Sequence, residues 1–218
     1  FVTDCEGNSK EIKPLINRAA EALDINTLTG LVEYVKSNIE RKQSQFFLQV
    51  LDERTVLLKG LLDSVGGRET LVVARAIVPY FDYGCFHRSE ELIIAFQSKF
   101  TQTNDRDLLL KVVGNVKEEN VRETGDNGVS QAVTIKTGIA SAADVLVPNP
   151  VTLAPYRTFL EVEQPTSNFV FRMKDGPAGA VFEADGGAWR NKAIMNVREY
   201  LKVELATEIE SGRITIIA

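Results

Sequence analysis

Two glutamates separated by one residue, Glu161 and Glu163, have the spacing in this chain that best suits metal chemistry. Residues two apart on a β-strand point to the same face, so the pair would present two carboxylates together. Such oxygen ligands suit a hard divalent cation that activates water, as in metal-dependent nucleases and phosphohydrolases, with Lys174 nearby. The alternative, which we favour, is cross-strand charge pairing of these acids with Arg172 and Lys174 on a solvated face.

A second group of residues combines positive charge with aromatic rings, which is the composition of a surface that binds single-stranded nucleic acid. Basic side chains neutralise phosphates, and aromatic rings stack on bases. The basic members are Arg157, Arg172, Lys174, Arg190 and Lys192. The aromatic members are Tyr156, Phe169 and Trp189. The alternative for the basic residues after Trp189 is the solvated face of a helix.

The remaining candidates for chemistry are weaker. Cys85 and His87 form a Cys-x-His pair, but a metal site needs a second pair of ligands. We interpret residues 80–88 as an aromatic-rich loop that closes one end of the core. The chain has two cysteines, Cys5 and Cys85, which we expect to be reduced thiols of a cytoplasmic protein. Phosphate-loop, dinucleotide and nucleophile-elbow motifs are absent, so we predict no catalytic residue and no cofactor.

The formal net charge of −5 disfavours a protein that coats nucleic acid non-specifically, although a local basic patch is compatible with it. It also allows an acidic surface that binds and inhibits a host protein. The densest acidic cluster in the sequence consists of Asp105, Asp107, Glu118, Glu119 and Glu123.

The elements that position these residues follow from periodicity. Alternation and turn residues predict three antiparallel strands at 158–163, 168–174 and 180–184. A second set of strands is predicted at 46–52, 55–62 and 69–78 and a hairpin at 118–123 and 129–137, with a closing strand at 212–217. Helical spacing predicts helices at 14–23, 28–41 (capped by Asn26 or Thr27), 89–101, 105–116 and 189–206. The last helix is expected to lie over the strands of 158–184.

Composition and element order set the fold class. Hydrophobic residues make up 44% of 218 residues, which suits a globular protein, and no apolar run is long enough to span a membrane. We predict an α+β fold in which antiparallel meanders form a mixed or antiparallel sheet, with helices packed mainly on one face. We expect residues 1–26 to form a partly irregular N-terminal segment and residues 27–218 to form a single α+β domain.

Several segments in this order resemble the YfdQ-like family of phage and prophage proteins. They are YVKSNIE (34–40), SEELIIAFQ (89–97), DLLLKVVGNV (107–116), VTIKTGI (133–139), VPNPVTLAPYRTF (147–159) and FVFRMKDG (169–176). The resemblance covers residues 28–217. It implies a protein encoded by a phage or prophage and no particular reaction, with genes of this type lying near functions of DNA metabolism or host takeover.

These arguments together predict a non-enzymatic phage accessory protein that acts by binding, in phage DNA metabolism or recombination. Exposed sheet edges favour a homo-oligomer. The alternatives are the inhibitor of a host defence protein and the metal-dependent nuclease or phosphohydrolase. The expected partners are therefore nucleic acid or a host protein, not a membrane.

Overall fold

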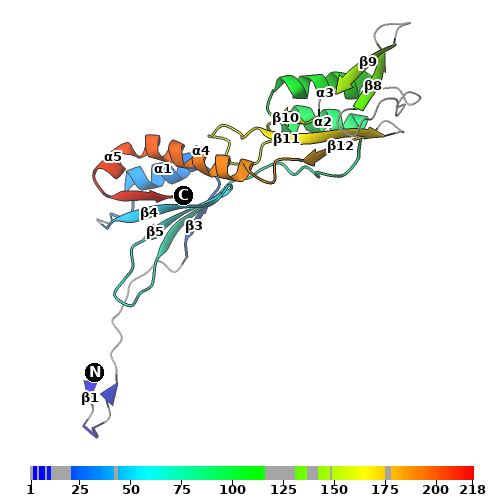
Figure 1. The fold of residues 1–218 in the computed structure, drawn as a ribbon. Coiled ribbons are helices and arrows are strands. Elements are labelled where there is room, and N and C mark those ends of the chain that lie inside the picture. The colour runs from blue at the N-terminus through cyan, green and yellow to red at the C-terminus, as the bar shows by residue number, and fades with distance from the viewer. Residues whose placement is uncertain are drawn as a thin grey trace.

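A computed structural model of the chain describes residues 2–3, 5–7, 9–10, 21–41, 44–115, 131–136, 142–147, 149–174 and 178–218. The protein is α+β, with helices packed against a mixed sheet and an antiparallel sheet. Figure 1 shows these elements in two lobes, and each lobe has its own sheet and its own cluster of buried apolar side chains. A separate antiparallel pair is formed by β1 (Val2–Thr3) and β2 (Ser9–Lys10).

The first lobe contains a five-stranded sheet in the order β13-β4-β5-β6-β3. The central strands are antiparallel, whereas β13 runs parallel to β4 and β3 runs parallel to β6. The strand bounds are β3 (Leu23–Ile25), β4 (Phe46–Asp52), β5 (Thr55–Gly60), β6 (Thr70–Arg75) and β13 (Ile214–Ile217). Helices α1 (Leu28–Ser37), α4 (Trp189–Glu204) and α5 (Ala206–Glu210) lie on one side of this sheet (Figure 1).

Helix α1 begins as its sequence predicts. The Thr27 side chain accepts a hydrogen bond from the backbone N–H of Gly30 at 3.1 Å, so it supplies the N-cap. The apolar stripe of this helix is buried in the first cluster together with alternate residues of β4. The helix ends at Ser37, earlier than expected, because Asn38 adopts a left-handed conformation with φ of 44°.

The second lobe contains a four-stranded antiparallel sheet in the order β10-β11-β12-β7. The strand bounds are β7 (His87–Arg88), β10 (Val151–Leu153), β11 (Ser167–Lys174) and β12 (Ala178–Glu183). Helices α2 (Ser89–Lys99) and α3 (Asn104–Asn115) pack together and bury Phe96 and Phe100 with Phe169 and Phe171 of β11. The pair β8 (Gln131–Lys136) and β9 (Ala142–Val147) completes this lobe.

A glycine on β12 allows α2 to approach the second sheet closely. A Cβ atom at Gly179 would lie 2.7 Å from Cδ2 of Leu92 and 3.2 Å from the ring of Phe171. Both neighbours are fully buried, so they have little room to move aside. The closeness of the helix to the sheet therefore depends on the missing side chain at this position.

The segment between β10 and β11, residues 154–166, crosses back from the second lobe to the first, and we call it the docking segment. Its Phe159 and Val162 side chains belong to the buried cluster of the first lobe. The Gln164 side chain braces the segment: its Oε1 accepts hydrogen bonds from the N–H groups of Arg157 and Thr158, and its Nε2 donates to the carbonyls of Phe159 and Val162. The two lobes are thus held together by apolar contact and an internal hydrogen-bond network.

The docking segment corrects the prediction of a strand at 158–163, which is wrong. The strand that pairs with β11 on the side away from β12 is β10, at Val151–Leu153, and the residues between β10 and β11 form a longer excursion. Alternating apolar and polar residues over six positions do not by themselves distinguish a strand from a turn. The decisive contacts are distant in sequence, because Phe159 enters the first lobe and Glu161 reaches the start of α1.

Other expectations are confirmed or corrected by the described residues. Most of the predicted strands and helices correspond to β4, β5, β6, β11, β12, β13, α1, α2, α3 and α4. Helix α4 covers the first sheet rather than the strands of the second lobe, because its stripe of Ala193, Val197 and Leu201 faces the first cluster. Strand β8 pairs with β9.

Residues 14–20 of the predicted N-terminal helix lie outside the described part of the chain. The end predicted for this helix, Leu23, belongs to β3. The first strand and turn of the hairpin predicted at 118–137 also lie outside it. The first sheet begins at β3, before residue 27, and the range 27–218 contains both lobes.

Candidate ligand pocket

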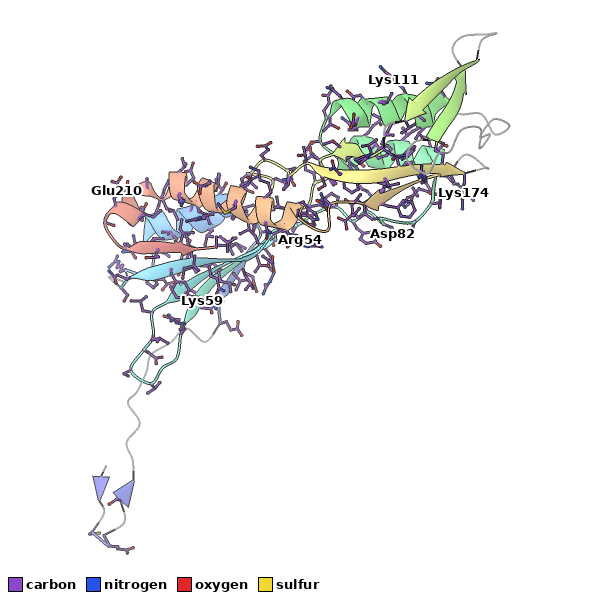
Figure 2. The ribbon with its side chains drawn as sticks, viewed as in Figure 1. Arg54, Lys59, Asp82, Lys111, Lys174 and Glu210 are labelled. Atoms are coloured by element: carbon purple, nitrogen blue, oxygen red, sulfur yellow. The ribbon has the colours of Figure 1, made fainter. Side chains whose placement is uncertain are left out.

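A pocket of about 310 Å³ lies where the two lobes meet. Its walls come from the β4–β5 turn, residues 78–83 after β6, the docking segment, the end of β12 and the first turn of α4. Figure 2 shows Arg54, one of its residues, at the junction of the lobes. The lining residues are Arg54, Val78, Pro79, Tyr80, Phe81, Tyr83, Tyr156, Arg157, Glu183, Trp189 and Arg190.

Arg157 is the buried centre of this pocket, with 3% of its surface exposed. Its Nη1 donates to Oε1 of Glu183 at 2.7 Å, and its Nη2 donates to Oγ of Ser167. The guanidinium carbon lies 3.9 Å from the ring centre of Trp189 and 5.4 Å from that of Phe169. Burial lowers the pKa of Arg157, and Tyr83 and Glu183 oppose that shift, but an arginine remains a cation in any case.

Tyr83 forms the apolar side of the same site. Its ring stacks on Phe169 with 5.7 Å between ring centres. Burial raises the pKa of Tyr83 to about 12, and the positive charge of Arg157 only partly offsets the effect. The phenol is therefore neutral over the whole physiological range and can serve as a hydrogen-bond donor.

Two half-exposed guanidinium groups, those of Arg54 and Arg190, share one carboxylate. The Nε atoms of Arg54 and Arg190 lie 3.9 and 3.8 Å from Oε1 of Glu53, whose side chain is mostly buried. One negative charge thus faces two positive charges at the pocket wall. The excess of positive charge makes this wall suitable for an anionic ligand group.

The surrounding backbone holds these two arginines in place. The Arg54 Nε donates to the carbonyl of Arg157, and the Thr158 hydroxyl donates to the carbonyl of Glu53, so the β4–β5 turn is bonded to the docking segment. The start of α4 is fixed by Asp185, whose carboxylate accepts hydrogen bonds from the N–H groups of Gly187 and Trp189.

The aromatic residues of the pocket differ in exposure. Trp189 is 3% exposed, with the Arg157 guanidinium 3.9 Å from its ring centre and that of Arg190 4.8 Å away, so the indole supports the arginines. Tyr80, in contrast, is 77% exposed, and Tyr156 is partly exposed beside it on the pocket wall. Both tyrosines are tied to α2, because the carbonyl of Tyr80 accepts from Lys99 Nζ and the N–H of Tyr156 donates to the carbonyl of Lys99.

The structure brings four of the eight predicted nucleic-acid-binding residues together in this pocket: Tyr156, Arg157, Trp189 and Arg190. The other four lie elsewhere. Arg172 and Lys174 are on β11, where Lys174 Nζ lies 4.3 Å from the ring centre of Phe86, and Lys192 is exposed on α4. Phe169 is buried on β11, and the most exposed ring of the pocket is Tyr80 rather than Trp189.

The paired glutamates do not share a strand face. Oε1 of Glu161 accepts hydrogen bonds from the N–H groups of Leu28 at 2.8 Å and Thr29 at 3.2 Å, so this carboxylate caps α1. Glu163 is exposed, and its carbonyl accepts from Asn196 Nδ2. Within the described ranges, no three His, Cys, Asp or Glu side chains gather as metal ligands.

The other predicted candidates are His87, the two cysteines and the acidic cluster, and none of them lines the pocket. The His87 ring nitrogen Nε2 lies 3.0 Å from the carbonyl of Asp82, and Cys5 and Cys85 are exposed free thiols. Asp105 accepts from the N–H of Thr152, and Asp107 accepts from the Gln102 side chain, so these acids bind within the second lobe. The other acids of that cluster, Glu118, Glu119 and Glu123, lie outside the described residues.

Sequence reasoning missed Arg54, Tyr80, Tyr83 and Glu183. The aromatic-rich loop predicted at 80–88 contains Tyr80 and Tyr83. Among its aromatic residues only Phe81 is buried in the core, as was expected for all of them. The contact that brings Arg54 to Arg157 joins residues 103 positions apart. A local pattern cannot indicate such a contact.

The chain matches no family model, no curated protein and no solved structure at a significant level. The resemblance to the YfdQ-like family therefore stays a prediction. Among the helices that the structure describes, none is long and apolar enough to cross a membrane.

Proposed function

We propose that this protein binds single-stranded nucleic acid without catalysing a reaction, and that one nucleotide occupies the pocket between its lobes. The observation that carries this proposal is the pairing of two half-exposed arginines, Arg54 and Arg190, with the exposed ring of Tyr80 around one pocket. Guanidinium groups bind phosphate oxygens in a bidentate geometry, and an exposed aromatic ring stacks on a base of any sequence.

The size of the pocket supports a single nucleotide. Ligand pockets range from about 300 to 1,000 Å³, and this one, at about 310 Å³, is at the lower end. It suits one base with its sugar and phosphate rather than a long track of bases. The net charge of −5 is compatible with this, because a local site lined by three arginines and one glutamate does not need a basic surface.

The biological setting rests on the resemblance and is proposed with it: a phage or prophage protein of the host cytoplasm, acting in DNA metabolism or recombination. A homo-oligomer is proposed on a structural argument. Among the strands that the structure describes, β13 ends the order of the first sheet and pairs with β4 alone, which favours pairing of its other edge with a second copy. Light scattering on a size-exclusion column measures this directly, and a monomer at all concentrations would contradict it.

The test of the binding proposal is fluorescence anisotropy with a short dye-labelled single-stranded DNA at low salt. The double variant Arg54→Gln with Arg190→Gln should weaken binding by about tenfold or more, since it removes both exposed phosphate contacts. The matched control is Lys59→Gln with Lys111→Gln, which changes the net charge equally at positions far from the junction (Figure 2).

The control should bind nearly as well as the unchanged protein. Equal weakening in both double variants would mean that net charge alone attracts DNA, and the pocket would lose its role. No binding by the unchanged protein at low salt would overturn the proposed function. The nuclease and host-inhibitor alternatives stay predictions, tested by turnover with magnesium or manganese and by copurification with a host protein.

A further inference from the structure

The pocket has one acidic lining residue among those that the structure describes, Glu183 at the end of β12. Its side chain is 36% exposed, so part of it is accessible from the pocket. A carboxylate in a pocket for a phosphate-bearing ligand needs an explanation, because it repels phosphate. It would instead attract a part of the ligand that donates hydrogen bonds.

We propose that Glu183 determines base specificity: its carboxylate accepts a hydrogen bond from the amino group of the base in the pocket. Cytosine, adenine and guanine carry such a group, and thymine and uracil do not. This inference rests on the proposed function and adds to it a preference that stacking and phosphate contacts cannot provide.

The carboxylate is fixed before any ligand arrives. Oε1 of Glu183 accepts from Nη1 of Arg157 at 2.7 Å, and Arg157 is held in turn by Ser167 and by the ring of Trp189. A carboxylate offers about four lone-pair sites, so one bond to Arg157 leaves capacity for a donor on the ligand. An acceptor held in this way favours a matching donor without a further loss of side-chain entropy.

The charges of the pocket also orient the nucleotide. Arg54 and Arg190 stand on the first lobe and attract the phosphate, whereas Glu183 stands on the second lobe and repels it. The exposed ring of Tyr80 offers a stacking surface on the same pocket. The base edge is therefore directed to Glu183, where a donor is favoured and the carbonyl oxygen of thymine at the equivalent position is disfavoured.

The experiment compares two dye-labelled DNA strands of equal length, one of deoxycytidines and one of thymidines, by fluorescence anisotropy. The unchanged protein should bind the cytosine strand about tenfold more tightly, the usual range for one specific base contact. The variant Glu183→Gln should reduce this ratio to about twofold or less, since an amide donates to thymine as readily as it accepts from cytosine. Its amide oxygen still accepts from Arg157, which favours an intact fold.

Glu199→Gln is the matched control, because it removes the same charge from an exposed position further along α4. It should keep the full ratio. A second comparison measures the affinities for strands that carry adenine or unsubstituted purine, which lacks only the amino group. The unchanged protein should bind the adenine strand more tightly, and this difference should disappear in Glu183→Gln.

The outcomes separate the two proposals. A ratio near one in the unchanged protein, or a full ratio kept by Glu183→Gln, would overturn the role of Glu183 and leave the proposed function standing. Absence of binding to either strand would overturn the proposed function and this inference with it. Because each ratio compares two ligands on one protein, a partly unfolded sample does not alter it.

Discussion

The guanidinium carbon of Arg157 lies 3.9 Å from the ring centre of Trp189, and this contact joins the docking segment to the first turn of α4. The same guanidinium donates to Glu183 of the second lobe, while the carbonyl of Arg157 accepts from Arg54 of the first. One residue thus contacts three parts of the pocket wall. The shape of the pocket and the attachment of the lobes depend on the same side chain.

Replacing Arg157 by methionine should lower the free energy of unfolding by about 2 kcal/mol or more, because a buried ion pair and its hydrogen bonds are lost. Chemical denaturation measures the change. Arg75→Met serves as the control, since the Arg75–Asp24 pair is exposed and should contribute less than about 1 kcal/mol. Equal losses in the free energy of unfolding for both substitutions would mean that the buried contacts of Arg157 contribute no more than an exposed ion pair.

Truncating Phe159 to alanine should cost about 3–5 kcal/mol, because a fully buried ring of the docking segment leaves the core of the first lobe. Its neighbour Leu160 is 68% exposed, so Leu160→Ala should change stability by about 0.5 kcal/mol or less. Thermal unfolding of the two variants makes the comparison. Equal losses of stability in both variants would contradict the burial of Phe159 in the first lobe.

Removing the Glu161 carboxylate should destabilise the start of α1. Glu161→Ala is expected to cost about 1 kcal/mol, as for other N-terminal caps, since two backbone N–H groups lose their acceptor. Glu163→Ala should be nearly neutral, because that side chain is exposed. Stabilisation of the unchanged protein by added magnesium, lost in both variants, would instead support a paired metal site.

The alkaline stability of the protein should depend on Tyr83. Its pKa in the folded state is about 12, above the ordinary value of 10.0, so the folded protein holds this proton more tightly than the unfolded chain does. The resulting stabilisation is complete below about pH 10 and is lost as pH rises towards about 12. Denaturation midpoints measured across this window should fall less steeply in Tyr83→Phe.

Tyr80→Phe is the control for that experiment, because Tyr80 is exposed on the same segment. It should leave the slope of the unchanged protein intact. The same slope in all three proteins would mean that other groups cause the alkaline loss of stability.

The salt dependence of DNA binding should report the number of arginines that contact phosphate. Each phosphate contact on a single strand contributes about 0.7 to the slope of log affinity against log salt. Arg190→Gln should therefore lower the slope by about that amount, and Lys192→Gln, two residues along the same helix and outside the pocket, should not. The reverse result would move the phosphate contact from the pocket to the outer face of α4.

Local patterns predicted the elements that depend on neighbouring residues. Strands β4 and β5 are confirmed because alternation and a short polar turn agree, and α1 is confirmed because Thr27 and the apolar stripe agree. The strand predicted at 158–163 failed because Phe159 packs in the core of the first lobe and Glu161 binds the start of α1, 133 positions away in sequence. Four residues of the pocket were predicted from their chemistry alone, as two pairs of an aromatic residue followed by an arginine: Tyr156 with Arg157, and Trp189 with Arg190.

The rest of the pocket could not be predicted because it is assembled by long-range contacts. Arg54 looked like part of an ordinary turn until the docking segment supplied its partner. Glu183 lay inside the strand predicted at 180–184, and its place in the pocket depends on Arg157, which fixes its carboxylate.

The parallel pairing of β13 with β4 has a consequence for the order in which the protein folds during synthesis. Residues 214–217 complete a sheet whose neighbouring strand is made from residues 46–52, so β4 stays unpaired on that side until residues 214–217 have been synthesised. The strands and helices of the second lobe lie between residues 87 and 183, all of which leave the ribosome earlier. The lobe that begins first is therefore the lobe that finishes last, and the pocket between them closes only when α4 arrives.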